Sequence, residues 1–119
     1  MRSKGCIVIV EPDELLRELL ERWLGGAGYK VISEKDRILS KVLPQLVIAD
    51  ISDPASAADT IEALQAAYAA PILALSARFR RGLGGSREQA QRLRVGKVLP
   101  KPFTREELLC AVDDVVKLS

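Results

Sequence analysis

Four polar residues each stand directly after an apolar segment of the chain, and their side chains have the chemistry needed to bind and transfer a phosphoryl group. They are Glu11, Asp50, Ser76 and Lys101. A carboxylate can take up a phosphoryl group as an acyl phosphate, while an ammonium group and a hydroxyl can contact the phosphoryl oxygens. A second carboxylate nearby calls for a cation between the two, and oxygen ligands favour Mg²⁺. A single aspartate after a strand would more simply cap a turn, so the prediction depends on the whole set.

The apolar segments before these residues have the composition of buried strands. Uninterrupted aliphatic and β-branched runs are typical of a parallel sheet whose two faces are both covered. Strands are predicted over residues 6–10, 29–33, 46–49, 72–75 and 98–99.

Apolar residues at three- and four-residue spacing predict helices between these strands. The helix over 57–70 is expected to place Ile61, Leu64 and Ala67 on the face that packs on the core. A capping box of Thr104 and Glu107 is expected to start the last helix. The first helix is predicted to start at Asp13 and to be stopped by the glycines at 25, 26 and 28. Further helices are predicted over residues 36–43, 57–70, 86–94 and 104–118.

Strand and helix alternate five times with no internal repeat and no linker. This pattern predicts a single α/β domain over residues 1–119, with helices on both faces of a parallel sheet. Right-handed crossovers bring the carboxyl ends of parallel strands to one rim of the sheet. We therefore expect the four polar residues to converge at that rim.

Composition excludes several classes of function. The chain has no histidine, which rules out Ser-His-Asp and Cys-His nucleophile systems, histidine metal sites and a phosphohistidine carrier. Cys6 and Cys110 both lie in apolar surroundings and are predicted to be buried, reduced thiols. No apolar run approaches the length of a membrane helix, and CIVIV is too short for a signal-peptide core, so a cytoplasmic protein without membrane contact is predicted.

Several motifs stand at spacings that are specific in combination: IVIVE followed by DELLRELLE, GYKVI, PQLVIADISDP, PILALSA and VLPKPFTREEL. With them the chain resembles, over residues 6–118, a response-regulator receiver domain, the chemotaxis-type module of two-component signalling. The resemblance implies a flavodoxin-like three-layer fold, with a five-stranded parallel sheet in the order 2-1-3-4-5 and five helices. It also implies that Asp50 is the phosphoacceptor, Lys101 its amine partner and Ser76 the hydroxyl that reports phosphorylation, with no enzymatic activity beyond self-catalysed phosphoryl transfer and dephosphorylation.

The predicted metal site departs from the family's pattern. The implied ligands are Glu11, Asp50 and the backbone carbonyl of Ser52, but Pro12 stands where a second acidic ligand is usual. Asp13 comes one place later and would reach the ion only if the loop shifted, so its favoured role is to cap the first helix. We therefore expect Mg²⁺ to be a weakly bound cofactor.

Other departures bear on how a signal would leave the domain. Val98 stands where the family usually has Tyr or Phe, and a β-branched aliphatic side chain cannot make a comparable swing. The second helix is shortened. Segment 78–94 carries six arginines against one acid, Glu88, and is either a basic docking face for an acidic partner or the solvated face of a short helix.

The predicted function is that of a phosphorylation-dependent receiver, to which a sensor histidine kinase or a phosphotransfer protein donates phosphate on Asp50. Output is expected through a protein bound to the face of the fourth helix, fifth strand and fifth helix, and nucleic acid is not an expected partner unless an effector domain is missing. The alternative, favoured by Pro12 and Val98, is a degenerate receiver that binds proteins independently of phosphorylation. A small α/β enzyme or nucleotide binder is disfavoured, because the glycine fingerprint is absent.

Overall fold

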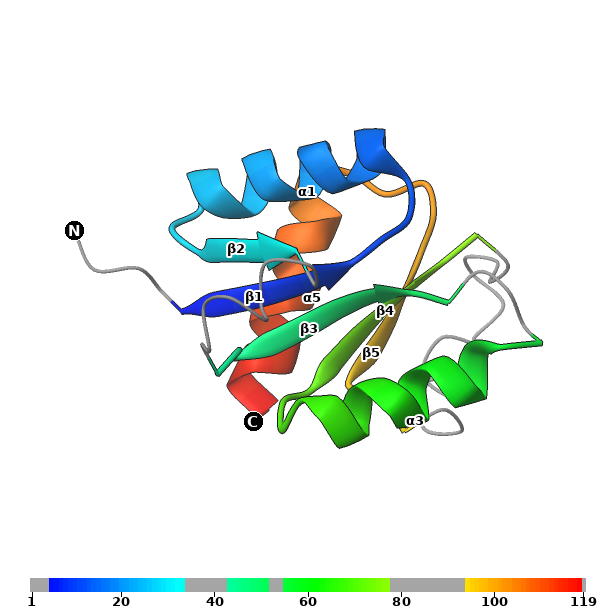
Figure 1. The fold of residues 1–119 in the computed structure, drawn as a ribbon. Coiled ribbons are helices and arrows are strands. Elements are labelled where there is room, and N and C mark those ends of the chain that lie inside the picture. The colour runs from blue at the N-terminus through cyan, green and yellow to red at the C-terminus, as the bar shows by residue number, and fades with distance from the viewer. Residues whose placement is uncertain (1–4, 34–42, 52–54, 78–93, 119) are drawn as a thin grey trace.

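A single parallel sheet of five strands runs through the molecule (Figure 1). The computed structural model describes residues 5–33, 43–51, 55–77 and 94–118. The strand order is β2-β1-β3-β4-β5, which confirms the order predicted from the sequence. The strands are β1 (Cys6–Val10), β2 (Lys30–Ser33), β3 (Leu46–Asp50), β4 (Ile72–Ser76) and β5 (Lys97–Pro100).

The continuous apolar runs of the central strands supply two hydrophobic cores, one on each face of the sheet. Successive side chains of a strand point to opposite faces, so alternate residues of one strand enter different cores. Ile7, Ile9, Leu46, Ile48, Leu73 and Leu75 lie in the first core, whereas Val8, Val47, Ala49, Ile72 and Ala74 lie in the second.

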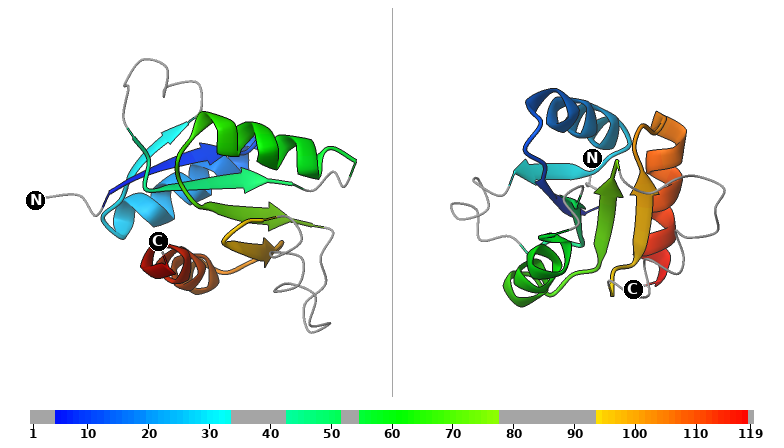
Figure 2. Two further views of the ribbon diagram at one scale, coloured as in Figure 1. Left: turned by 90° about the horizontal axis from the view of Figure 1, so that it is seen from below. Right: turned by 90° about the vertical axis from the view of Figure 1, so that its right-hand side faces the viewer.

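The helices cover the two faces of the sheet unequally in the described part of the chain. Helices α1 (Glu14–Gly26) and α5 (Arg105–Leu118) pack on the first core, and α3 (Ala57–Ala67) packs on the second (Figures 1 and 2). The helix predicted over 86–94 and nearly all of the one over 36–43 fall outside the described residues, so the predicted count of five helices stays a prediction. No helix in the described ranges is long and apolar enough to cross a membrane.

Local capping starts α1 and α5 as the sequence predicts. Oδ1 of Asp13 accepts the backbone N–H groups of Leu15 at 3.0 Å and Leu16 at 3.3 Å. At α5, Thr104 N donates to Glu107 Oε1 at 2.9 Å, and Glu107 N donates to Thr104 Oγ1 at 3.1 Å. Each cap satisfies backbone donors that have no partner within the helix.

The ends of two helices differ from the prediction. Helix α1 continues through the first two glycines and ends at Gly26, where neither glycine meets a neighbouring atom that restricts it. Helix α3 ends at Ala67 rather than at residue 70, because Tyr68 takes an extended conformation and is buried in the second core. Burial of this large ring outweighs the helix propensity of the alanines, and Ala67 itself is exposed.

The two cysteines are both free, but only one of them is buried. Cys6 lies within β1 and is buried, as predicted. Cys110 is exposed, so that prediction was wrong. The buried face of α5 is formed by Leu108, Ala111, Val112 and Val115, and the helical period places residue 110 away from it.

Candidate functional site

The four polar residues of the sequence analysis lie at the carboxyl ends of neighbouring strands. Asp50 and Ser76 are the last residues of β3 and β4, while Glu11 follows β1 and Lys101 follows β5. Backbone hydrogen bonds continue the pairing past the strand ends. Ile51 N donates to Leu75 O at 2.8 Å, and Lys101 N donates to Ser76 O at 2.9 Å. The main chain thus holds all four residues at one rim.

The Lys101 ammonium joins two carboxylates at this rim. Its Nζ donates to Asp50 Oδ1 at 3.0 Å, and to Glu11 Oε2 at 3.1 Å and Oε1 at 3.3 Å. The side chains are 19% exposed for Lys101, 17% for Asp50 and 2% for Glu11. The expected convergence of the amine with both carboxylates is confirmed, across 90 residues of sequence for the Lys101–Glu11 pair.

Glu11 is the most deeply buried charged group of this cluster. Burial raises the pKa of its carboxyl group above the ordinary value of 4.5, the Lys101 ammonium lowers it, and the neighbouring Asp50 charge raises it further. The net direction is upward. Asp13 N also donates to Glu11 Oε1 at 3.3 Å, so the loop backbone helps to hold this carboxylate in place.

This raised pKa predicts a pH-dependent difference in stability between the wild type and Glu11→Gln. A carboxyl group whose pKa is higher in the folded chain stabilises the fold most at acid pH, and this contribution is lost as pH rises from 4.5 through the folded-state pKa. We expect the free energy of unfolding of the wild type, measured relative to Glu11→Gln by urea titration, to fall from that pH toward neutrality. A relative gain of the wild type over that interval would contradict the expected direction.

The other predicted site residues have different placements. Ser76 is fully buried between the neighbouring strands β3 and β5. Ser52 lies outside the described residues. Asp13 caps α1 through Oδ1, which is the favoured one of its two predicted roles.

The carboxylates present suit a hard cation in number and kind. Mg²⁺ is usually held by one or two carboxylates, with water and phosphate oxygens completing its shell, and Glu11 and Asp50 supply two. Within the described ranges, no three acidic, cysteine or histidine side chains gather as metal ligands. Any ion at this rim would therefore depend on the same two carboxylates that Lys101 already holds.

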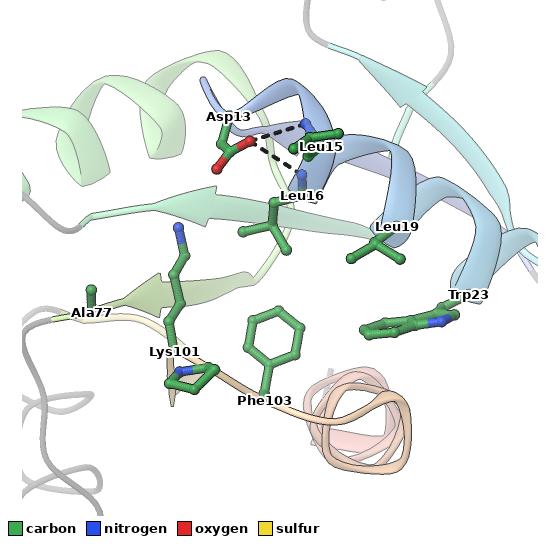
Figure 3. A pocket seen from close by; sticks show the side chains of 9 residues that line it. Asp13, Leu15, Leu16, Leu19, Trp23, Ala77, Lys101 and Phe103 are labelled. Carbon is green, nitrogen blue, oxygen red and sulfur yellow. Dashed lines mark hydrogen bonds between the residues drawn. The ribbon is translucent and has the colours of Figure 1, made fainter.

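A groove of about 490 Å³ opens beside Lys101 (Figure 3). Its charged end is formed by Lys101 and Asp13, and Trp23 lies toward the other end. The rings of Trp23 and Phe103 meet edge to face, with centroids 6.4 Å apart. Most of the remaining lining is apolar, from Leu15, Leu16, Leu19, Ala77 and Pro102.

This groove was not predicted from the sequence, although the sequence contains a signal for it. Leu15 is 75% exposed and Leu19 is 37% exposed. The apolar residues of α1 cover a wider arc than a helix packed on one sheet needs, since its buried contacts centre on Leu20 and Leu24. The excess leucines are the part of the pattern that could have indicated a partner surface.

Comparison with known proteins adds to these observations. No family model matches the chain. It is 32% identical over 123 residues to protein PetR of Rhodobacter capsulatus, covering 97% of this chain and 50% of that protein. It is 37% identical over 109 residues to the uncharacterized transcriptional regulatory protein YrkP of Bacillus subtilis, covering 86% of this chain and 45% of that protein. The chain thus spans about half the length of the curated relatives it matches.

The fold has close counterparts among solved structures. A response regulator receiver protein from Burkholderia phymatum superposes with a TM-score of 0.74 at 24% identity, covering 98% of both chains. This structural likeness agrees with the strand order and with the transcriptional regulatory protein found by sequence. The predicted resemblance is therefore confirmed, and the chain has the fold of a response-regulator receiver domain.

Proposed function

We propose that this chain is the phosphate-accepting receiver of a two-component system, and that Asp50 takes a phosphoryl group from a sensor histidine kinase or a phosphotransfer protein. The observation that carries the proposal is the Lys101 ammonium, which sits 3.0 Å from the carboxylate of Asp50 at the rim of a receiver fold. One Asp50 oxygen attacks phosphorus, and the bond from phosphorus to the donor's histidine nitrogen breaks. Its electron pair stays on the imidazole.

Each residue of the cluster has a role in this transfer. Asp50 is partly exposed and so remains accessible to a donor. Lys101 moves toward the new phosphoryl oxygens, and Ser76 donates its hydroxyl to one of them. Glu11, Asp50 and the backbone carbonyl of Ser52 would hold Mg²⁺, which would supply positive charge to the phosphoryl oxygens.

Incubation with acetyl phosphate and Mg²⁺, followed by intact mass measurement, tests this proposal. The expected result is the gain of one phosphate.

The second candidate, a degenerate receiver that binds its partners without phosphorylation, predicts no gain at any Mg²⁺ concentration. Pro12 supports this candidate, and so does Val98, which is an aliphatic side chain only 1% exposed on β5. A degenerate receiver would still signal through contact with another protein. In the described part of the chain, the predicted output face consists of β5 and α5.

The groove beside Lys101 is the proposed docking surface for the phosphate donor. It is continuous with the cluster, because Lys101 belongs to both. Its apolar stretch along α1 suits a partner helix that presents apolar residues one turn apart. The charged end is formed by Asp13 and Lys101, and the Lys101 ammonium also binds the carboxylates of Glu11 and Asp50, so negative charge is in excess near this end and suits basic groups beside the donor's histidine.

Leu15→Gln is expected to slow transfer from a histidine kinase without affecting labelling by acetyl phosphate. Loss of one well-packed apolar contact from a docking interface costs about 1.4 kcal/mol or more, which corresponds to about a tenfold lower kcat/KM for the kinase reaction. The small phosphodonor does not need the groove, so its rate should stay unchanged.

The matched control for this experiment is Leu43→Gln. Leu43 is 87% exposed and precedes β3, at the end of that strand opposite to Asp50. Equal losses of kcat/KM for Leu15→Gln and Leu43→Gln would show that the groove is not the docking surface for the phosphate donor. A change in oligomeric state in Leu15→Gln alone would assign the groove to a second copy of the chain instead.

A further inference from the structure

We infer that the groove beside Lys101 is also a binding site for a small molecule with an apolar body and one cationic head, such as an arylalkylamine. The cationic head lies at Asp13, and the apolar body extends along α1 toward Trp23 and Phe103. A molecule bound there occupies the surface that is proposed above for the phosphate donor. This competition rests on the proposed function, whereas the binding itself does not.

The size and the lining of the groove are the first support. Ligand pockets in proteins usually enclose about 300–1,000 Å³ and combine an apolar lining with a few polar groups. The groove has a volume of about 490 Å³, and only Asp13 and Lys101 among its lining residues are charged. A helix advances about 15 Å from residue 13 to residue 23, so an extended molecule of about a dozen non-hydrogen atoms can contact both ends.

The apolar part of the groove is the second support. Trp23 of α1 and Phe103, which precedes α5, meet edge to face with ring centroids 6.4 Å apart. Leu15 and Leu19 lie one helical turn apart on α1, and both are exposed. An apolar molecule that covers these side chains removes hydrocarbon surface from water, which is the main source of affinity for a ligand of this kind.

The carboxylate of Asp13 selects the charge of the head group. Its Oδ1 accepts the backbone N–H groups of Leu15 at 3.0 Å and Leu16 at 3.3 Å, whereas within the described ranges no donor contacts its Oδ2. The N–H donors of an ammonium group form charge-assisted hydrogen bonds with a carboxylate oxygen of this kind. The groove therefore offers a cation one oxygen that the helix cap does not use.

The cations near this end do not reverse that preference. The Lys101 ammonium is bound by the carboxylates of Asp50 at 3.0 Å and Glu11 at 3.1 Å. The guanidinium of Arg17 pairs with Glu14 at 3.6 Å. With Asp13 added, carboxylates outnumber cations here, so a cationic molecule is favoured over an anionic one of the same shape.

Titration with 4-phenylbutylamine tests the inference, with 4-phenylbutanol and 5-phenylvalerate as its neutral and anionic counterparts. Trp23 is the only tryptophan of the chain, so its fluorescence reports binding in this groove. For the amine we expect a saturable shift of emission to shorter wavelength, with a Kd on the order of 1 mM. The two counterparts should bind about fivefold more weakly. Equal affinities of the three compounds would overturn the inference, as would the absence of a saturable shift with the amine.

Asp13→Asn removes the charge without removing the helix cap. Asparagine caps helices about as well as aspartate, so α1 should begin as in the wild type. We expect about fivefold weaker binding of the amine and unchanged binding of the alcohol. Glu18→Gln is the matched control, because Glu18 is exposed on α1 and does not line the groove. Equal weakening in the two variants would show that the groove does not hold the head group, and would overturn the inference.

Leu19→Ala tests the apolar part of the site. Truncation of this exposed side chain should weaken binding of both the amine and the alcohol by about fivefold. Leu43→Ala is the control, since Leu43 is also an exposed leucine but lies outside the groove. Wild-type affinity in Leu19→Ala would mean that the molecule does not lie along α1, and this result would also overturn the inference.

Competition with the phosphate donor is measured separately, with autophosphorylation of the kinase followed in parallel. We expect saturating 4-phenylbutylamine to slow phosphoryl transfer from the histidine kinase and to leave labelling by acetyl phosphate unchanged. The binding titrations need neither phosphate nor a kinase. Saturable binding without slower transfer would therefore retain the small-molecule site and reject the groove as the docking surface of the donor.

Discussion

Asp50→Asn is expected to abolish phosphate incorporation from acetyl phosphate completely. The amide that replaces the carboxylate has no anionic oxygen to attack phosphorus, so no acyl phosphate can form. The substitution keeps the size of the side chain, and Lys101 retains Glu11 as a partner at 3.1 Å, so the fold should persist. Intact mass after incubation with acetyl phosphate and Mg²⁺ should show one added phosphate on the wild type and none on the variant.

The control for this measurement is Asp59→Asn. Asp59 lies exposed in the first turn of α3, and its substitution should leave labelling at the wild-type level. Continued labelling of Asp50→Asn would show that another residue accepts the phosphate, and the proposed role of Asp50 would then be wrong. Unfolding of Asp50→Asn can be checked independently by circular dichroism before the labelling result is interpreted.

Leu24→Ala is expected to destabilise the fold by about 2–5 kcal/mol. Leu24 is fully buried in the core between α1, α5 and the sheet, where truncation removes apolar contacts and leaves a cavity. Since a domain of this size is stable by about 5–15 kcal/mol in total, the loss would be readily measured by urea unfolding.

Leu15→Ala, on the same helix, provides the matched comparison for that prediction. Leu15 is 75% exposed, so its truncation should change the free energy of unfolding by less than about 0.5 kcal/mol. Similar losses for the two variants would mean that α1 does not pack on the sheet through Leu24. The comparison therefore tests which face of α1 is buried, independently of any signalling role.

The sequence alone was sufficient to predict the strands of the sheet and the rim at which its polar residues gather. Apolar runs mark the strands, and the alternation of strands with helices implies a parallel arrangement whose carboxyl ends share one rim. Asp13 and the Thr104–Glu107 pair were predicted as caps for a local reason, since each bonds to backbone groups within three residues. The order of the strands came from the family resemblance, not from the composition of any strand.

Only the tertiary structure showed how these parts are used. The position of Lys101 after a predicted strand placed it correctly at the rim with Asp50. The sequence could not show that the ammonium binds Glu11 as well as Asp50, or that Glu11 is almost fully buried. The end of α3 at Tyr68 and the exposure of Cys110 likewise depend on what packs against each side chain. The apolar groove beside Lys101 forms between α1 and the segment after β5, which are distant in sequence.

Some features could be predicted from the sequence and others could not, because they depend on interactions of different range along the chain. Helix periodicity, capping and strand composition depend on residues a few positions apart, and these can be read from the chain itself. Burial, ion-pair distances and pKa values depend on atoms contributed by segments far apart in sequence. They change when those atoms move by a few tenths of an ångström. The gathering of these polar side chains at one rim was therefore foreseeable from the sequence, while the contacts of Lys101 with both carboxylates became visible only from the packing.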